Sequence, residues 1–219
     1  MREKLSSGTP VEVVEPDKPT DVGLVVIPDI WGLRPLFDDL AVRFATEWGV
    51  AVAVVEPFPN SDLGESLDAR FAAVPQLSDE AFLADLLQAA DRLGKAKTVL
   101  MGFCMGGMYC FKATASDRFV RIASFYGMIV IPEAWRSPTQ REPLQYMAGG
   151  NADRVLAVIG GKDIWTPAAD VKHLVDLRVK VALYPEAEHG FAHDSSRPAH
   201  RPADAASAFA RARDWLLAN

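Results

Sequence analysis

The residues with the clearest chemical potential lie in the segment GFCMGG, residues 102–107, which follows a short apolar stretch and opens a helical pattern. A nucleophile with glycine two positions away on each side is typical of a strained turn from a strand into a helix. At such a turn the helix N-terminus favours a thiolate at Cys104, and the backbone N–H of Met105 can donate to an oxyanion. A Gly-rich turn around a buried, inert cysteine is the alternative explanation.

An acid and a base follow Cys104 in the order that this type of turn requires of its partners. Asp163 lies in GGKDIWTP just after the apolar stretch VLAVI, and His189 lies in EHGF just after another predicted strand. Side chains at the carboxyl ends of parallel strands share one edge of the sheet. Taken singly, Asp163 could be a solvated turn residue and His189 a surface loop residue. Their order together with Cys104 favours nucleophilic catalysis.

Strands alternate with helices along the whole chain, and several strands are apolar on both faces. This pattern predicts an α/β fold with a mostly parallel sheet covered by helices on both faces, in a single domain over residues 1–219. The predicted strands are 11–14, 23–27, 50–55, 98–101, 122–126, 155–159 and 179–183. The predicted helices are 35–48, 79–93, 105–114, 166–177 and 203–217. We expect a loop with a short helix at 60–78 and a surface excursion at 132–151.

Composition narrows the class of protein. The 219 residues carry 23 basic and 29 acidic side chains, a formal net charge of −6, and no basic run that would bind a phosphate backbone. The two cysteines, Cys104 and Cys110, do not form a disulfide scaffold, and Cys110 is expected to pack in the core. No apolar signal core or membrane-length segment is present, so we expect a cytoplasmic protein without nucleic-acid or membrane partners, either monomeric or a weak homo-oligomer.

With these residues identified, the chain resembles the dienelactone hydrolase family, also called carboxymethylenebutenolide hydrolases. The matching segments, spread over roughly residues 23–217, are VVIPDIWG (25–32), GFCMGG (102–107), FYG (125–127), GGKDIWTP (160–167) and EHGFAH (188–193). The resemblance implies an α/β-hydrolase fold and cleavage of an ester or lactone bond in a small substrate, without a cofactor. It implies Cys104 as nucleophile, Asp163 as orienting acid and His189 as base.

The same resemblance implies further roles and shows two departures. The N–H groups of Ile30 and Met105 would form the oxyanion hole. The family usually has Glu where this chain has Asp29, which would contact and help to ionise the resting cysteine, or would only cap its loop. The family places a carboxylate-binding Arg where this chain has His193, and Arg70 loosely matches a second such Arg. A histidine lacks the bidentate fork of arginine, so dienelactone itself is not expected as the substrate.

Trp31 and Trp165 flank the expected site residues and are the aromatic side chains expected to line a pocket, whereas most other aromatic residues are expected in the core. The same residues suggest three alternative functions. A metal site at His189 and His193 lacks the HExxH pattern, so no metal is expected. A protein that binds a small ligand without turnover and an acyl transferase with the same three residues remain alternatives.

Overall fold

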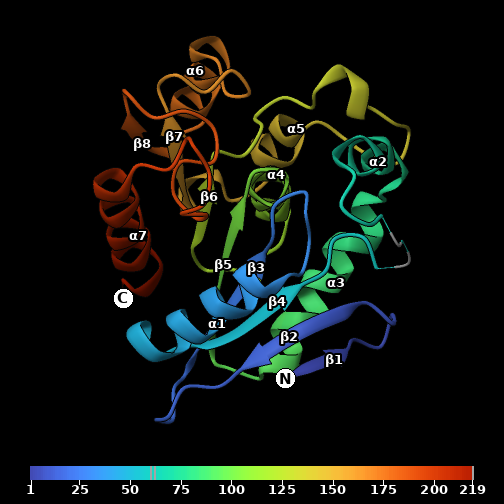
Figure 1. Ribbon diagram of the computed structural model, residues 1–219, viewed down its shortest axis with the longest axis vertical. Helices are drawn as coiled ribbons and strands as arrows, with labels where there is room; N and C mark the ends of the chain where they lie inside the picture. Colours follow the sequence, from blue (N-terminus) through green and yellow to red (C-terminus); the bar gives the residue numbers. More distant parts are fainter. Residues whose placement is uncertain (60, 62, 219) are drawn as a thin grey trace.

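A computed structural model describes residues 1–59, 61 and 63–218, and its eight strands form one sheet in the order β1-β2-β4-β3-β5-β6-β7-β8. The strands are β1 (Arg2–Lys4), β2 (Pro10–Val14), β3 (Val22–Ile27), β4 (Ala51–Val55), β5 (Lys97–Phe103), β6 (Ile122–Phe125), β7 (Val155–Gly160) and β8 (Lys180–Tyr184). Strands β3 to β8 pair in parallel, and β1 and β2 add an antiparallel edge. Figure 1 shows β1 and β2 at this edge of the sheet, next to the N-terminus of the chain.

Helices cover both faces of the sheet, as expected (Figure 1). The α-helices are α1 (Pro35–Trp48), α2 (Leu67–Ala73), α3 (Asp79–Leu93), α4 (Met105–Lys112), α5 (Pro143–Ala148), α6 (Ala168–Asp176) and α7 (Pro202–Leu217). The short 3₁₀ helices are η1 (Val74–Gln76), η2 (Ala113–Ala115), η3 (Glu133–Trp135) and η4 (Ala152–Arg154). Helices α1 and α7 pack on one face, whereas α3, α4, α5 and α6 pack on the other. The prediction of an α/β fold with a mostly parallel sheet is confirmed.

Helix α1 illustrates how local sequence sets these elements. Pro35 occupies its first turn, where the missing N–H costs nothing, and Gly49 ends it at φ 65°. Between these two residues, Phe37, Leu40 and Phe44 recur at helical spacing and are buried. Burial of each such side chain contributes about 1.5–3 kcal/mol, so the packed face stabilises the helix more than its intrinsic propensity does.

The parallel register places four chain segments at one edge of the sheet. Strands β3, β5, β7 and β8 all run in the same direction, so the loops after Ile27, Phe103, Gly160 and Tyr184 leave the sheet at the same side. These four loops carry the expected site residues except Met105, which begins α4, and Arg70, which lies in α2. Side chains from distant parts of the sequence therefore meet beyond the carboxyl ends of the strands, where open α/β sheets bind ligands.

Two local predictions were wrong. The expected surface excursion at 132–151 contains η3 and α5 and buries Trp135 and Met147 in the core, because Phe71 and Trp165 pack on Trp135 and α5 packs on α4. The helix expected from residue 166 begins at Ala168, with Pro167 as its N-cap. Within the part of the chain that the structure describes, no helix combines the length and apolarity needed to cross a bilayer.

Candidate active site

Cys104 lies on a strained turn between β5 and α4. Its backbone has φ 56° and ψ −117°, a region that non-glycine residues rarely adopt and that costs about 1–3 kcal/mol. The turn is held on both sides, because the Cys104 N–H donates to the Phe125 carbonyl at 3.0 Å and its own carbonyl accepts from Met108 N–H at 3.0 Å. Cys104 is partly exposed, so the strain presents its sulfur at the edge of the sheet.

Glycines allow the backbone to approach this turn closely. A methyl group at Gly106 would overlap the carbonyl oxygens of Ile27 and Pro28, and one at Gly102 would overlap the Gly106 carbonyl. Helix α4 can therefore start directly against the loop that follows β3. Among the described residues, neither the Ile30 nor the Met105 N–H donates a hydrogen bond to another protein group, so both are free to bind a ligand oxygen.

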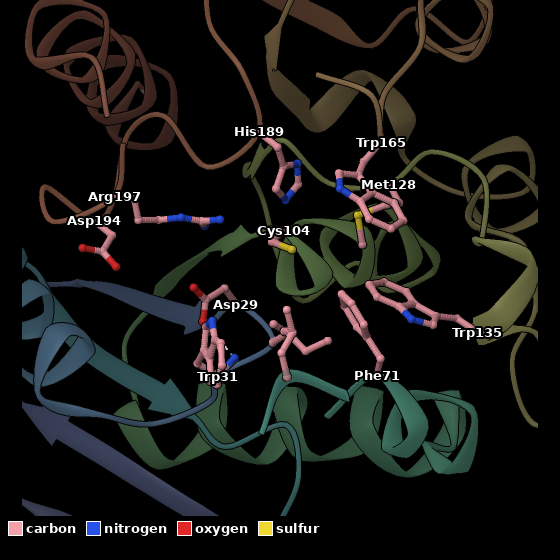
Figure 2. Close-up of a pocket in the computed structure, with 12 residues that line it drawn as sticks. Asp29, Trp31, Phe71, Cys104, Met128, Trp135, Trp165, His189, Asp194 and Arg197 are labelled. Atoms are coloured by element: carbon pink, nitrogen blue, oxygen red, sulfur yellow. Dashed lines mark hydrogen bonds between the residues drawn. The ribbon is translucent and has the colours of Figure 1, made fainter. Parts of the chain in front are cut away.

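The structure brings Asp163, His189 and Cys104 together. The His189 Nδ1 lies 2.8 Å from Asp163 Oδ2, and the fully buried Asp163 side chain also accepts from the Trp165 N–H at 2.8 Å. The other side of the His189 ring faces Cys104 (Figure 2). Burial alone lowers the pKa of His189, but the Cys104 charge and the hydrogen bond to Asp163 outweigh it and raise the pKa to about 10.

These residues open into a cavity of about 480 Å³ between the loops (Figure 2). Its lining consists of Asp29, Ile30, Trp31, Leu67, Phe71, Cys104, Met128, Trp135, Trp165, His189, Asp194 and Arg197. The volume suits a small molecule, and the walls are mostly apolar with a few polar groups, as ligand sites usually are. Trp31 and Trp165 line the cavity, as predicted from the sequence.

The Asp29 carboxylate has three hydrogen-bonding partners: the Trp31 N–H, the Arg34 guanidinium and the His193 ring. Arg34 Nη1 donates to its Oδ1 at 2.6 Å, and His193 Nε2 donates to its Oδ2 at 2.8 Å. Burial raises the pKa of Asp29, but the hydrogen bonds from His193 and Arg34 outweigh it and hold the pKa well below the ordinary value of 3.8. Asp29 is therefore a buried carboxylate whose charge is balanced by the Arg34 guanidinium.

The hydrogen bonds of Asp29 continue through His193 to Tyr126. With Asp29 ionised, His193 Nε2 carries the proton, so the Tyr126 hydroxyl donates to Nδ1 at 2.5 Å. Burial lowers the pKa of His193 and raises that of Tyr126, which keeps both groups neutral. The Tyr126 ring packs edge-on against His189. The chain Arg34–Asp29–His193–Tyr126 thus connects the loop after β3 to the surroundings of His189.

This arrangement corrects the expected substrate contacts of His193 and Arg70, and of the two roles stated for Asp29 it fits the loop cap, because Asp29 Oδ1 accepts from the Trp31 N–H at 3.0 Å. Among the described residues no hydrogen bond joins Asp29 to Cys104, because Arg34 and His193 hold both carboxylate oxygens. The His193 side chain has no exposed surface and does not line the cavity, so the structure gives no support for direct contact with substrate. Arg70 also lies outside the lining, where it donates to the Ile30 carbonyl at 3.1 Å and covers the Trp31 ring.

Several lining residues were not identified from the sequence. Phe71, Met128, Trp135 and Arg197 reach the cavity from four separate segments, and none of them belongs to a recognisable motif. Arg197 is the most informative, because among the described residues its guanidinium forms no salt bridge or hydrogen bond. It lies against Gly190, where a methyl group would overlap it. Figure 2 shows it directed toward the centre of the cavity.

Within residues 1–59, 61 and 63–218, no group of three or more His, Cys, Asp or Glu side chains lies in a position to hold a metal ion. His189 and His193, the pair weighed as a metal site, face different partners. His189 contacts Asp163, whereas His193 lies between Asp29 and Tyr126.

Comparisons with known proteins find relatives that span most of the chain. The chain is 28% identical over 211 residues to a probable 2-oxo-3-(5-oxofuran-2-ylidene)propanoate lactonase of a Bradyrhizobium species, covering 85% of this chain and 79% of that protein. It is 25% identical to a candidate carboxymethylenebutenolidase of Saccharolobus solfataricus, covering 92% and 90%. The crystal structure of a candidate dienelactone hydrolase from Klebsiella pneumoniae superposes with a TM-score of 0.84 at 23% identity, covering 96% of this chain and 93% of that one.

The family model for the dienelactone hydrolase family matches residues 10–218, nearly the whole described chain. The sequence relatives carry names of the same group of enzymes. The chain therefore belongs to the dienelactone hydrolase family, whose members are hydrolases of ester or lactone bonds with the α/β-hydrolase fold.

Proposed function

We propose that this enzyme cleaves an ester or lactone of a small molecule through an acyl-enzyme on Cys104, with His189 and Asp163 completing a triad. The observation that carries the proposal is that a strained cysteine and a hydrogen-bonded His–Asp pair meet at one cavity, beside the Ile30 and Met105 N–H groups, which donate to no described protein group. Each group serves one step of acyl transfer.

The reaction follows from the positions of these groups. The Cys104 thiolate attacks the substrate carbonyl carbon, and the resulting oxyanion accepts hydrogen bonds from the Ile30 and Met105 N–H groups. The intermediate collapses with cleavage of the C–O bond, and protonated His189 gives its proton to the leaving alkoxide. His189 then takes a proton from water, and the hydroxide attacks the thioester carbon, so that the C–S bond breaks and restores the thiolate beside protonated His189. The carboxylic acid product leaves and gives its proton to solvent. Asp163 holds the imidazole in the required tautomer throughout.

The acyl-enzyme is directly testable. We expect acid-quenched protein, mixed briefly with p-nitrophenyl acetate, to carry one acetyl group, localised by fragment mass spectrometry to Cys104. Cys110 is an internal control, because its sulfur is completely buried and burial raises its pKa. The Cys104→Ala variant should carry no acetyl group. Rapid hydrolysis with no acyl group on Cys104 at any quench time would overturn the proposal.

The same experiment separates the alternatives. A ligand-binding protein without turnover would release no product beyond the first equivalent of nitrophenolate. An acyl transferase would form the Cys104 adduct and then pass it to an added alcohol in preference to water. Under the proposal, product release continues in water alone, and its rate does not depend on the alcohol.

The environment of Arg197 indicates the charge of the substrate. A guanidinium at the cavity that forms no side-chain hydrogen bond or salt bridge with the described residues favours an anionic group of the substrate. Asp194 lines the same side, but its carboxylate accepts from Ser196 and lies 3.9 Å from Arg34. We therefore propose that Arg197 holds a carboxylate of the substrate.

Replacement of Arg197 tests this assignment. We expect Arg197→Met to lower kcat/KM about 10- to 100-fold for an ester that bears a free carboxylate, since a hydrogen bond to a charged group contributes about 1.5–3 kcal/mol. The loss should be small for the corresponding primary amide of that ester. Arg213→Met, on the exposed side of α7, is the matched control and should change neither value. An equal loss for the charged and neutral substrates would contradict the proposed contact.

A further inference from the structure

Three aromatic rings form one wall of the cavity, on the side away from Arg197 (Figure 2). Phe71 comes from α2, Trp135 from η3 and Trp165 from the loop after β7. The Trp135 and Trp165 rings stack at 6.1 Å between centroids with an interplanar angle of 15°, and Phe71 lies 5.6 Å and 6.4 Å from them. We call these three residues the aromatic wall.

The aromatic wall is preformed. Trp135 is only 3% exposed and anchors the cluster in the core, and Phe71 also packs against the core. Trp165 stacks on this base but is 37% exposed, so much of its surface is left for a ligand. Rings held in place by each other lose little conformational freedom when a ligand binds, which favours affinity.

The wall ends next to the reacting atoms. The Trp165 ring lies 6.4 Å from the His189 ring, centroid to centroid, and Met128 lies between the wall and Cys104 in Figure 2. The neighbouring lining residues on this side, Leu67 and Met128, are uncharged. A ring placed on the wall would therefore lie beside a carbonyl group over Cys104, opposite any group held by Arg197.

We propose that the aromatic wall is a binding subsite for a flat, unsaturated ring of the substrate, and this inference rests on the ester or lactone hydrolase function proposed above. Such a ring offers a π face to the indole of Trp165, which aromatic pairs favour beyond the area that they bury. A saturated ring of similar size buries similar apolar area but is puckered and has no π face. The subsite therefore selects flat rings over puckered ones.

Matched substrate pairs measure this selection without changing the reactivity of the ester. Trifluoroethyl 3-phenylpropanoate and 3-cyclohexylpropanoate differ only in the ring on the acyl side, and 2-phenylethyl and 2-cyclohexylethyl acetate differ only on the alcohol side. We expect kcat/KM to favour the phenyl member of at least one pair by about three- to tenfold. The pair that shows the preference identifies which side of the ester contacts the wall.

Variants at Trp165 link the preference to the wall. Trp165→Leu keeps an apolar side chain and the backbone N–H that donates to Asp163, but it removes the flat surface, so the phenyl-to-cyclohexyl ratio should fall to about one. Trp165→Phe should keep most of the preference. Trp48→Leu is the control, because Trp48 is half-buried and packs against Phe44 in α1, outside the cavity lining, and the ratio should equal that of the wild type.

A ratio near one in the wild type for both pairs, or a preference that persists in Trp165→Leu, would overturn the subsite while leaving the hydrolase function intact. A wild-type protein that hydrolyses none of the four esters would refute the proposed function instead. In that case titrations with 2-phenylethanol and 2-cyclohexylethanol, followed by tryptophan fluorescence, measure the affinity of the subsite for each alcohol without turnover. Tighter binding of the flat alcohol supports the wall, and equal binding overturns it.

Discussion

The Cys104→Ala variant is expected to lose kcat/KM for ester substrates by about 10⁴-fold or more. The reason is that, among the described lining residues, Cys104 carries the only thiol or hydroxyl group beside the Ile30 and Met105 N–H groups, which would donate hydrogen bonds to an oxyanion. The remaining groups could only activate water. Residual hydrolysis above background would then come from the oxyanion donors and from substrate binding.

The measurement should separate loss of chemistry from loss of folding. Circular dichroism and urea unfolding of Cys104→Ala should show an intact protein, because the side chain is partly exposed. Cys110→Ala is the matched control. The Cys110 thiol lies in α4 and is buried in the core, so its removal should lower the stability of the protein. The folded variant should nevertheless keep its kcat/KM within about threefold of the wild-type value. Retention of most of the esterase activity by purified Cys104→Ala would show that another group is the nucleophile.

The order of elements was predictable from the sequence because local signals and packing agree. The helix at 79–93 begins after Ser78, whose side chain accepts from the Ala81 N–H, and ends at Gly94 in the left-handed region. The buried strands are continuous apolar runs, as parallel sheets require. Strand β1 was missed because its three residues are polar, and only pairing with β2 makes them a strand.

The position of the candidate site was also predictable, whereas its walls were not. Cys104, Asp163 and His189 follow strands, so topology alone brings them to one edge of the sheet. Trp135 lies in a proline-rich segment that resembles a surface loop, and only the tertiary contacts with Phe71 and Trp165 bury it. Such long-range contacts have no local signature in the sequence.

The interpretation of His193 shows a second limit. By position in its motif it corresponds to a residue expected to contact substrate, and its type allows charge. The fold instead places it between Asp29 and Tyr126, where burial lowers its pKa. The cavity cation is Arg197, four residues further along the chain, which is free of protein partners among the described residues. Which of two nearby side chains enters a cavity depends on the loop backbone, and residue type alone does not determine it.

The second large effect is expected for Asp163→Asn, which should lower kcat by about 10³- to 10⁴-fold. The asparagine can keep an oxygen toward the Trp165 N–H, so the loop should remain in place. Its amide NH₂ would then face His189 Nδ1, which must act as an acceptor and gives up its proton there. The neutral imidazole would then carry its proton on Nε2, which is the wrong tautomer to take a proton from water. The charged ring would also lose the stabilising charge of Asp163.

The pH dependence provides a readout that a purely structural role for Asp163 would not change. The pKa of His189 is raised from 6.5 to about 10, so the charged ring and the stability that it contributes are fully present below pH 6.5 and are lost as the pH rises through 10. Loss of the Asp163 hydrogen bond and charge lowers the pKa of His189. The alkaline limb of the kcat/KM profile, and the alkaline loss of stability in urea titrations, should both move toward neutral pH in Asp163→Asn.

Asp170→Asn, in the first turn of α6, is the matched control, because this carboxylate lies in the same segment but outside the cavity lining. It should reproduce the wild-type rate and the wild-type alkaline limb. If Asp163→Asn instead lowered kcat with an unmoved alkaline limb, His189 would not depend on Asp163 for its charge. The carboxylate would then only hold the loop through the Trp165 N–H, and another group would have to orient the imidazole.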